Sequence, residues 1–427
     1  MKIRKILSCV AAAVLVSGTI ASCDKSAGSD GGKKAEDVTL TLWSISTESD
    51  SFHSAYVQAI EDFEKSHEGV KVKHETFENE SYKTKIKSAV AANELPDVFY
   101  TWAGGFSQSF VDSGKILCLD DYYPKYKDEL SEAALSNLMY DGKLYGSVIV
   151  SPVSLMWYNK KIMDKYSLKA PETWDDFEKV CDTLIENKVT PIATSVKDKW
   201  VLAMLHDGLT LKSVGPDKLQ KCLLKDGVSY SDPDFLASAQ KIRDLVDKGA
   251  FIDGAAGLSN DEASAEFYTG NAAMYFTGSW MGGSIVTDAE NEADFEVAPI
   301  PVINSSNAKI TDFMGGGSDS LMVAKSTKNA DLSAELAFEI TKGVSKYGYL
   351  SGAGIPAWKV TYDDSEVPRL TKEVANYVNG ATSFTLWFDT LLESEDAGEY
   401  LALLQKLYVG SIKPEDFQKA MAAQLEK

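Results

Sequence analysis

The first folded part of the chain alternates strand-like and helix-like patterns. Residues 38–42 alternate valine and leucine with threonine, which is typical of a half-buried strand. The next apolar residues recur at three- to four-residue spacing and predict an amphipathic helix that ends before Gly69, namely Phe52, Tyr56, Ala59, Ile60 and Phe63. A strand at 70–72, a helix capped by Ser81 and a strand at 97–100 follow. Strands that alternate with helices predict a mainly parallel sheet covered on both faces.

A second set of alternating elements begins after an extended segment at 147–152. Thr173 and Asp176 bracket the first turn of a predicted helix, as in a capping box, and a strand is expected at 191–193. The remaining expected elements are, in chain order, a helix at 261–268, a strand at 272–276, a glycine-rich segment at 313–320, a strand at 321–324, a helix at 332–342 and a closing helix from Pro414. The chain therefore contains two α/β units.

The N-terminus has the pattern of a processing signal. Three basic residues precede an apolar run at 6–20, which at about 1.5 Å per residue is too short to cross a hydrocarbon core of about 30 Å. This pattern predicts a secretion signal at 1–22. Ile20-Ala21-Ser22-Cys23 resembles the lipobox of bacterial lipoproteins, so Cys23 is the predicted lipidation site, and 23–37 is expected to be a flexible tether. The alternative is an ordinary signal peptide with a stray cysteine.

Composition narrows the function classes. The 427 residues are 44% apolar and 25% charged, which fits two or three folded units. A net charge of -20 argues against binding to nucleic acid. Beyond Cys23, the three cysteines Cys118, Cys181 and Cys222 are an odd number, so at least one thiol is free unless it bridges another chain. No cysteine pair or cysteine–histidine cluster has metal-ligand spacing, and neither a metal site nor a cofactor is expected.

Motifs of common enzymes are missing from the sequence. It has no G-x-S-x-G, no phosphate-binding P-loop and no H-E-x-x-H, and Gly315-Gly316-Gly317 does not match the dinucleotide fingerprint because Ser320 replaces its third glycine. The glycines at 315–317 either allow the backbone to approach a solute or bend the chain between units. A carboxylate pair for glycoside hydrolysis is compatible with sixty-three acidic residues.

Six short segments follow one another in an order that is characteristic of one family. They are Leu95-Pro-Asp-Val-Phe-Tyr-Thr-Trp102, Asp141-Gly-Lys-Leu-Tyr-Gly146, Trp157-Tyr-Asn-Lys-Lys161, Pro171-Glu-Thr-Trp-Asp-Asp-Phe177, Gly270-Asn-Ala-Ala-Met274 with Gly278-Ser-Trp280, and Ala330 to Thr341. From about residue 38 onward, the chain resembles the family 1 extracellular solute-binding proteins of bacterial sugar ABC importers.

The resemblance implies an α/β fold of the periplasmic-binding-protein type. Two α/β lobes joined by crossing strands hold a solute in the cleft between them and close on it. Lobe one is expected at 38–150 plus 318–345, and lobe two at 151–317 plus 346–427. The protein is expected to be a monomer.

Tryptophans that follow predicted strands are the main candidates for ligand contacts. Ligands of open α/β sheets bind beyond the carboxyl ends of strands, and flat rings suit the C–H faces of a pyranose. The candidates by position are Trp43, Trp102 and Trp280, Trp200 is a further candidate, and the resemblance supports Trp102, Trp280 and Trp387. Each ring also fits a core position, and Trp157 and Trp174 are interpreted as packing residues.

Two acidic residues, Glu48 and Asp319, are candidates to accept hydrogen bonds from neighbouring hydroxyls, although acidic loop residues are commonly only solvated. The resulting prediction is a lipid-anchored, extracytoplasmic receptor that captures a carbohydrate, preferably an oligosaccharide, and delivers it to ABC transporter permease subunits. It binds no nucleic acid and performs no chemistry. The alternatives are a lipid-anchored secreted glycoside hydrolase, with carboxylates about 5 to 10 Å apart, and a binding protein for a peptide or polyol.

Overall fold

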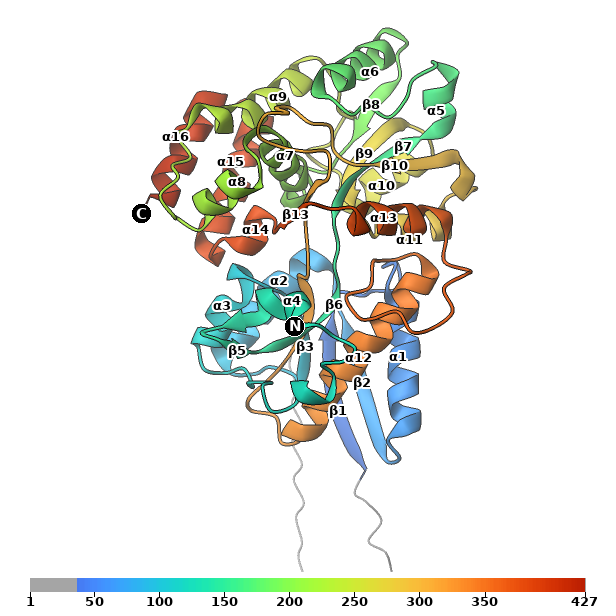
Figure 1. The fold of residues 1–427 in the computed structure, drawn as a ribbon, viewed down its shortest axis with the longest axis vertical. Helices are drawn as coiled ribbons and strands as arrows, with labels where there is room; N and C mark the ends of the chain where they lie inside the picture. The colour runs from blue at the N-terminus through green and yellow to red at the C-terminus, as the bar shows by residue number, and fades with distance from the viewer. Residues whose placement is uncertain (1–36, 427) are drawn as a thin grey trace, which may run out of the picture. The chain divides into compact units, whose positions relative to one another are not determined.

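Two mixed β-sheets organise the chain, each inside its own lobe (Figure 1). The structure, a computed structural model, describes residues 37–426. The expected signal at 1–22, the lipidation site Cys23 and the tether up to residue 36 lie outside the described residues. Within residues 37–426, no helix has the length and apolar character that crossing a membrane requires.

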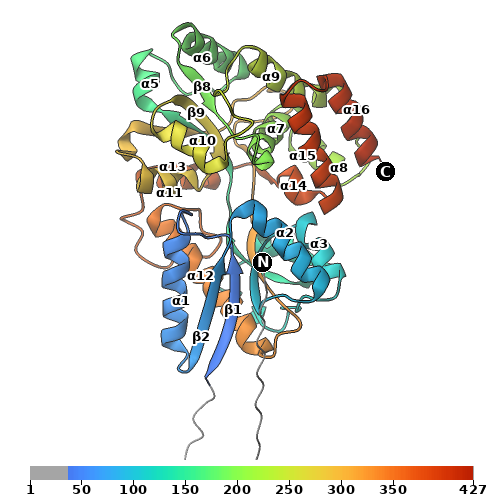
Figure 2. The same cartoon turned by 180° about the vertical axis from the view of Figure 1, so that it is seen from behind.

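The first lobe is built on a five-stranded sheet. Its strands, in spatial order, are β2 (Val70–Thr76), β1 (Val38–Ser44), β3 (Val98–Trp102), β12 (Asp319–Val323) and β6 (Gly146–Val150). β1 pairs in parallel with β2 and β3, whereas β12 is antiparallel to β3 and β6. Helices α1 (His53–Ser66) and α12 (Ala330–Ser351) pack together on one face, and α2 (Asn79–Ala92) and α3 (Gly105–Asp112) lie on the other (Figure 2).

The second lobe is built on a four-stranded sheet and a larger set of helices. Its strands, in spatial order, are β10 (Phe295–Ala298), β7 (Ser154–Asn159), β9 (Ala272–Gly278) and β8 (Thr190–Ala193). Its helices are α5 (Lys160–Lys165), α6 (Trp174–Glu186), α7 (Lys199–Val214), α8 (Pro216–Leu223), α9 (Leu236–Asp247), α10 (Asn260–Tyr268), α11 (Met281–Asp288), α13 (Arg369–Asn379), α14 (Phe388–Leu391), α15 (Ser394–Tyr408) and α16 (Pro414–Leu425).

Short elements complete the two lobes. They are the hairpin of β4 (Met139–Tyr140) and β5 (Lys143–Leu144), the parallel pair of β11 (Asp312–Met314) and β13 (Ser383–Thr385), helix α4 (Glu132–Leu135), and the 3₁₀ turns at Tyr123–Lys125, Ser136–Leu138, Pro233–Phe235 and Glu292–Asp294.

Both sheets are mixed, because one strand in each runs against all the others, and the predicted mainly parallel direction holds for the remaining strands. Strands β7 and β12 are the reversed ones, and each enters its lobe directly from the other lobe. A strand that enters from the cleft must run away from it, whereas β3 and β9 run toward the cleft. As a result, the first residues of β7 and β12 lie beside the last residues of β9 and β3, with Ser154 opposite Gly278 and Asp319 opposite Trp102.

Three chain segments cross between the lobes side by side. The Gly316 amide donates to the Pro152 carbonyl at 2.9 Å, and the Ser151 amide donates to the Ile355 carbonyl at 3.0 Å. Gly315 has φ of 132°, and a Cβ there would lie 2.1 Å from the Pro152 oxygen. Gly315 therefore serves the close approach of two crossing segments, which is a use beside the two that were expected from the sequence.

The change of lobe expected after residue 345 falls inside helix α12. This helix continues to Ser351 and ends at Gly352, which has the left-handed φ of 93° that glycine tolerates. Trp358 also packs into the first lobe's core, and its indole N–H donates to the Val148 carbonyl at 2.9 Å.

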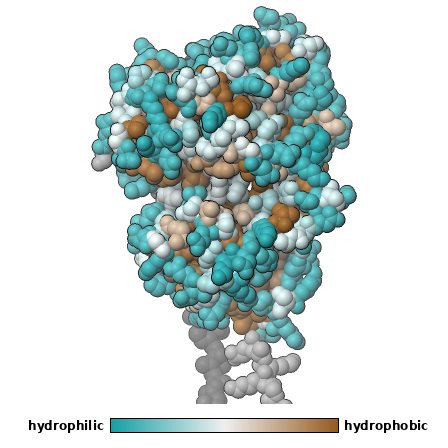
Figure 3. All heavy atoms as spheres, viewed as in Figure 1, coloured by the Kyte–Doolittle hydropathy of each residue, from teal (hydrophilic) through white to brown (hydrophobic). Residues whose placement is uncertain are grey.

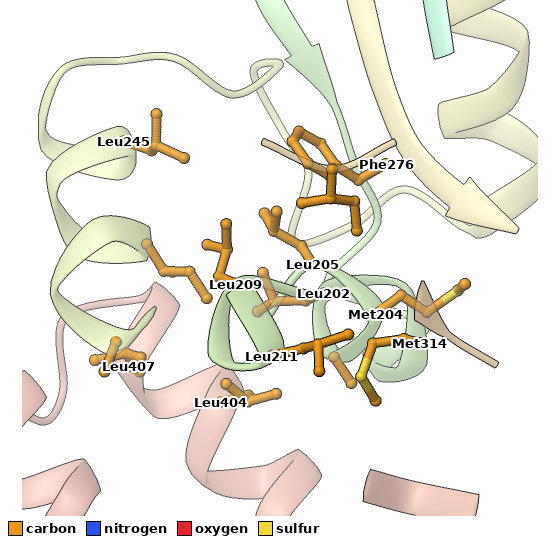
Figure 4. Packing of buried hydrophobic residues seen from close by; sticks show 14 of the residues in the cluster. Leu202, Met204, Leu205, Leu209, Leu211, Leu245, Phe276, Met314, Leu404 and Leu407 are labelled. Carbon is orange, nitrogen blue, oxygen red and sulfur yellow. The ribbon is translucent and has the colours of Figure 1, made fainter. Parts of the chain in front are cut away.

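Helix α7 is the centre of the second lobe's core. Its residues from Val201 to Val214 are buried all round, which is typical of a core helix rather than a surface helix. Leucines of α7 pack against side chains of α9, α15 and β9 (Figure 4). Trp157 and Trp174, interpreted as packing residues, are 0% and 3% exposed. The three described cysteines are free thiols, of which Cys181 and Cys222 are buried.

Of two N-cap residues predicted from the sequence, one is confirmed and one was wrong. Thr173 caps α6 as predicted, because its hydroxyl accepts from the Asp176 amide at 3.3 Å. The expected cap at Ser81 was wrong. Glu78 caps α2 instead by accepting from the amides of Glu80 and Ser81, and Ser81 lies inside the first turn. A carboxylate suits this position because it faces the positive end of the helix dipole.

Candidate ligand-binding cleft

A cavity of about 560 Å³ lies between the two lobes. Its first-lobe wall consists of the loop after β1, the start of α2, the end of β3 and Asp319 at the start of β12. Its second-lobe wall consists of the starts of α7 and α10, Trp280 after β9, and the segment 387–390. The volume is within the usual range for small-ligand sites. In Figure 3, the band between the lobes is paler than their mostly hydrophilic outer surfaces.

Four of the predicted tryptophans line this cavity: Trp102, Trp200, Trp280 and Trp387. The rings of Trp200 and Trp280 meet edge to face, with centroids 5.9 Å apart. Trp102 is held between Tyr100 and Phe106, whose ring centroids each lie 5.0 Å from its own. Rings fixed by other rings keep one orientation, so they present ready-made flat surfaces to a ligand.

Trp387 is the most buried of the four, with 6% exposure. Its indole N–H donates to the Ser154 hydroxyl at 2.7 Å, at the start of β7. One edge of this ring therefore supports the second lobe while the remainder borders the cavity.

Two predicted residues lie outside the lining formed by the described chain. Trp43 is inside β1 rather than after it, packs edge to face on Phe77 at 5.5 Å, and has the Lys85 ammonium 4.2 Å from its ring centroid. Glu48 is an exposed residue of the loop after β1, and the neighbouring Thr47 and Ser49 border the cavity instead.

Asp319 joins the site at the start of β12. Desolvation in the cleft raises its pKa to about 6, against the effect of hydrogen bonds from Ser318 and Tyr100, and the charge of Asp50 raises it further. Asp50 lines the same cavity and accepts hydrogen bonds from the Ser46 hydroxyl at 2.8 Å and the Phe52 amide at 2.9 Å. Desolvation also raises the pKa of Asp50.

Asp50 and Asp389 also line the cleft, although neither was predicted from the sequence. Desolvation raises the pKa of Asp389 to about 6. Asp50 stands in the polar loop after the first strand, so the rule that named Trp43 also pointed to it. Asp389 gives no such signal, because it follows a segment that reaches the cleft only through the tertiary fold.

A buried polar network positions the 387–390 segment. Asp207 on α7 accepts from the Phe388 amide at 3.0 Å and from the Tyr400 hydroxyl. His206, the next residue, lies 2.9 Å from the same hydroxyl through Nδ1. His206 and Asp207 are both fully buried, and burial lowers the pKa of His206 to about 3. A neutral imidazole in this network fixes the loop that carries Trp387 and Asp389.

The raised pKa of Asp319 gives ligand binding a pH dependence. If the carboxylate accepts ligand hydroxyls, protonation removes charged acceptors that are each worth about 1.5 to 3 kcal/mol, so affinity should fall roughly tenfold from pH 7.5 to pH 5. Calorimetry at both pH values measures this change. Asp319→Asn should bind weakly at both, with a smaller pH effect that reports Asp389. An unchanged pH profile in the variant would remove Asp319 from the binding groups.

The stability of the ligand-free protein should depend on pH in the opposite direction: the Asp319 contribution to the free energy of unfolding should fall as the pH rises. A folded-state pKa above the unfolded value means that the protonated form favours folding, so this contribution is present below about pH 4 and lost as the pH rises through about 6.

Two lobes around a cavity, joined by three crossing segments, define a bilobal solute-binding protein. The family of bacterial extracellular solute-binding proteins matches residues 48–340, and the chain belongs to this family. The resemblance read from the six sequence segments is thereby confirmed.

Known proteins similar to the chain support the same fold. The multiple sugar-binding protein of Streptococcus mutans is 25% identical over 84% of each chain. A structure from a study of xylan utilization by Caldanaerobius polysaccharolyticus is 34% identical, covers 90% of this chain and 99% of its own, and superposes with a TM-score of 0.87. The structure of a chitin oligosaccharide binding protein is 25% identical, covers 92% and 99% of the two chains, and gives a TM-score of 0.83.

Proposed function

We propose that this protein captures a carbohydrate, preferably an oligosaccharide, in the cleft and delivers it to the permease subunits of an ABC transporter. The observation that carries this proposal is the set of four tryptophans, from both lobes, around one cavity that also holds carboxylates. Aromatic rings suit the apolar faces of sugar rings, and carboxylates accept hydrogen bonds from hydroxyl groups. The similar proteins support the ligand class, since their names or titles refer to sugars, xylan utilization and chitin oligosaccharide.

The proposed action is binding and release without chemistry. A solute that contacts both lobes favours the closed state over the open one, and the closed shape is the signal for the permease. The protein acts as a monomer in this scheme, because one chain supplies both walls of the cavity.

A thermal-shift screen against mono- and oligosaccharides, with polyols and short peptides in the same panel, tests the proposal. A ligand at 100 times its dissociation constant stabilises the folded state by about 2.7 kcal/mol, which gives a measurable rise in melting temperature. Overnight incubation followed by chromatography should return the bound oligosaccharide intact. Stabilisation by peptides or polyols alone would contradict the carbohydrate assignment, and shorter products would reveal a glycoside hydrolase.

Lobe closure should be visible by small-angle scattering, with a smaller radius of gyration in the presence of saturating ligand. The lobes touch where Gly105 meets the segment 390–392, and a Cβ on Gly105 would lie 2.3 Å from the Leu392 carbonyl oxygen. Gly105→Ala is therefore expected to hold the lobes apart, which weakens binding and reduces compaction. Gly398→Ala, at an exposed position of helix α15 where a Cβ has no neighbour within 4 Å and the backbone is helical, is the control for a glycine substitution. An unchanged radius in the unsubstituted protein would indicate a rigid site.

The membrane anchor is proposed at Cys23, which lies outside the described residues. Lipid on this thiol would hold the extracytoplasmic protein at the membrane through burial of its acyl chains. Cys23→Ala should abolish labelling by a metabolic fatty acid and block lipid-dependent processing. Label that persists in the variant would contradict lipidation at Cys23. Cys118→Ala is the matched control and should retain the label.

A further inference from the structure

The cleft has an excess of negative groups. Seven carboxylates line it, belonging to Asp50, Glu78, Glu80, Asp198, Asp261, Asp319 and Asp389. Among the described lining residues, only Lys83 and Lys197 carry positive charge. A ligand that enters the cavity therefore meets carboxylates on every side.

The two lysines are poorly placed to neutralise an anionic ligand. The Lys83 ammonium already pairs with Glu80 at 2.7 Å and lies 5.3 Å from the centroid of the Trp102 ring. Lys197 is exposed to solvent, where its charge is screened. Neither cation is an unpaired group buried inside the cavity.

Arginine is the usual partner for a carboxylate ligand because its guanidinium donates two parallel hydrogen bonds. Residues 37–426 contain two arginines, and neither lines the cavity. Arg243 donates to the carbonyls of Leu407 and Tyr408, and Arg369 donates to Glu373 and to the carbonyl of Phe295. Both guanidinium groups are committed to structural contacts in the second lobe.

The negative charge comes from both lobes. Asp50, Glu78, Glu80 and Asp319 belong to the first lobe, whereas Asp198, Asp261 and Asp389 belong to the second. Desolvation raises the pKa of Asp198, and the charges of Glu80 and Glu78 across the cleft raise it further. Closure around an additional negative charge would therefore be opposed by both walls at once.

We propose that the cleft selects against anionic saccharides and that its ligand is an uncharged sugar. This proposal rests on the proposed function, since it assigns a ligand class to the same cavity. Specificity of this kind is a difference between two affinities, and unpaired like charges are an effective way to produce it. Hydroxyl groups donate to the carboxylates, whereas a uronic acid or sulfate group meets only Lys83, which is paired with Glu80, and the solvent-exposed Lys197.

Calorimetry with matched pairs of oligosaccharides provides the test. The probes are cellotriose and the same trisaccharide oxidised at C6 to a uronic acid, and xylotriose with and without a glucuronosyl substituent. We expect each neutral saccharide that binds to have an affinity about tenfold or more higher than that of its acidic partner at low salt. The ratio of the two affinities should be smaller in 0.5 M NaCl.

A variant with fewer cleft carboxylates tests whether these groups cause the discrimination against acidic saccharides. Glu80→Gln/Asp261→Asn removes two exposed carboxylates, one from each wall, and should lower the neutral-to-acidic ratio several-fold. Asp175→Asn/Glu186→Gln makes the same change of net charge on the exposed face of α6 and should leave the ratio unchanged. An equal effect of both variants would assign the discrimination to overall charge and overturn the proposal.

The outcomes separate this proposal from the proposed function. If acidic members bind as tightly as neutral ones, or if only acidic members bind, carbohydrate capture stands and charge selection is wrong. If no saccharide of either kind binds here or in the wider thermal-shift panel, the proposed function itself fails.

Discussion

Replacement of Trp280 by alanine is expected to weaken saccharide binding about 5- to 150-fold, which corresponds to a loss of about 1 to 3 kcal/mol by analogy with bases stacked on aromatic side chains. Trp280 follows β9, lines the cavity from the second lobe and meets Trp200 edge to face. Trp102→Ala should have a similar effect from the opposite wall. Calorimetry with the sugar found by the thermal-shift screen measures both.

Packing residues of the same type provide the control for this prediction. Trp174 is 3% exposed in the core of the second lobe, so Trp174→Ala should lower the melting temperature while the affinity of the folded protein changes little. Trp387→Ala should show both effects, since its ring borders the cavity and its N–H is bonded to Ser154. If Trp102→Ala and Trp280→Ala melt lower and bind normally, both rings are core residues and the site assignment is wrong.

The largest loss of stability from a polar substitution is expected for Lys212→Met. Lys212 is 2% exposed on α7, and its ammonium donates to the carbonyls of Lys309 at 2.8 Å, Ile310 at 3.0 Å and Asp312 at 2.6 Å. Methionine fills similar space but donates no hydrogen bond, so all three carbonyl groups lose the ammonium, although the Lys309 carbonyl still accepts from the Asp312 amide at 3.2 Å. Breaking a buried charged arrangement of this kind costs about 3 to 5 kcal/mol in the free energy of unfolding.

Urea unfolding of Lys212→Met and Lys199→Met checks this expectation. Lys199 is the first residue of the same helix and is partly exposed, so its substitution should change stability by less than about 0.5 kcal/mol. The Lys212 contacts hold the segment that continues through β11 to Gly315, where the chain crosses between the lobes. Equal stabilities of the two variants would show that the three carbonyl contacts contribute no net free energy.

Local patterns in the sequence determined most of the secondary structure and the family. The alternation at residues 38–42 and the three- to four-residue spacing of the next helix correspond to β1 and α1, because burial of one face requires those periods. Thr173 and Pro414 mark the starts of α6 and α16 through the same local rules. The six family segments could also be recognised from the sequence alone, and the family that they indicate implies the two-lobed fold.

The contents of the cleft depended on tertiary structure. Asp319 and Trp102 are far apart in sequence and meet because β12 enters the first lobe from the cleft and pairs antiparallel with β3. The same reversal made the sheets mixed, and no local pattern reports strand direction. Asp389 and Lys212 acquire their surroundings from segments far away in the chain, through contacts of α7 with 388–400 and 309–312. Periodicity shows which face of an element is buried, whereas long-range packing alone decides which buried and polar groups meet.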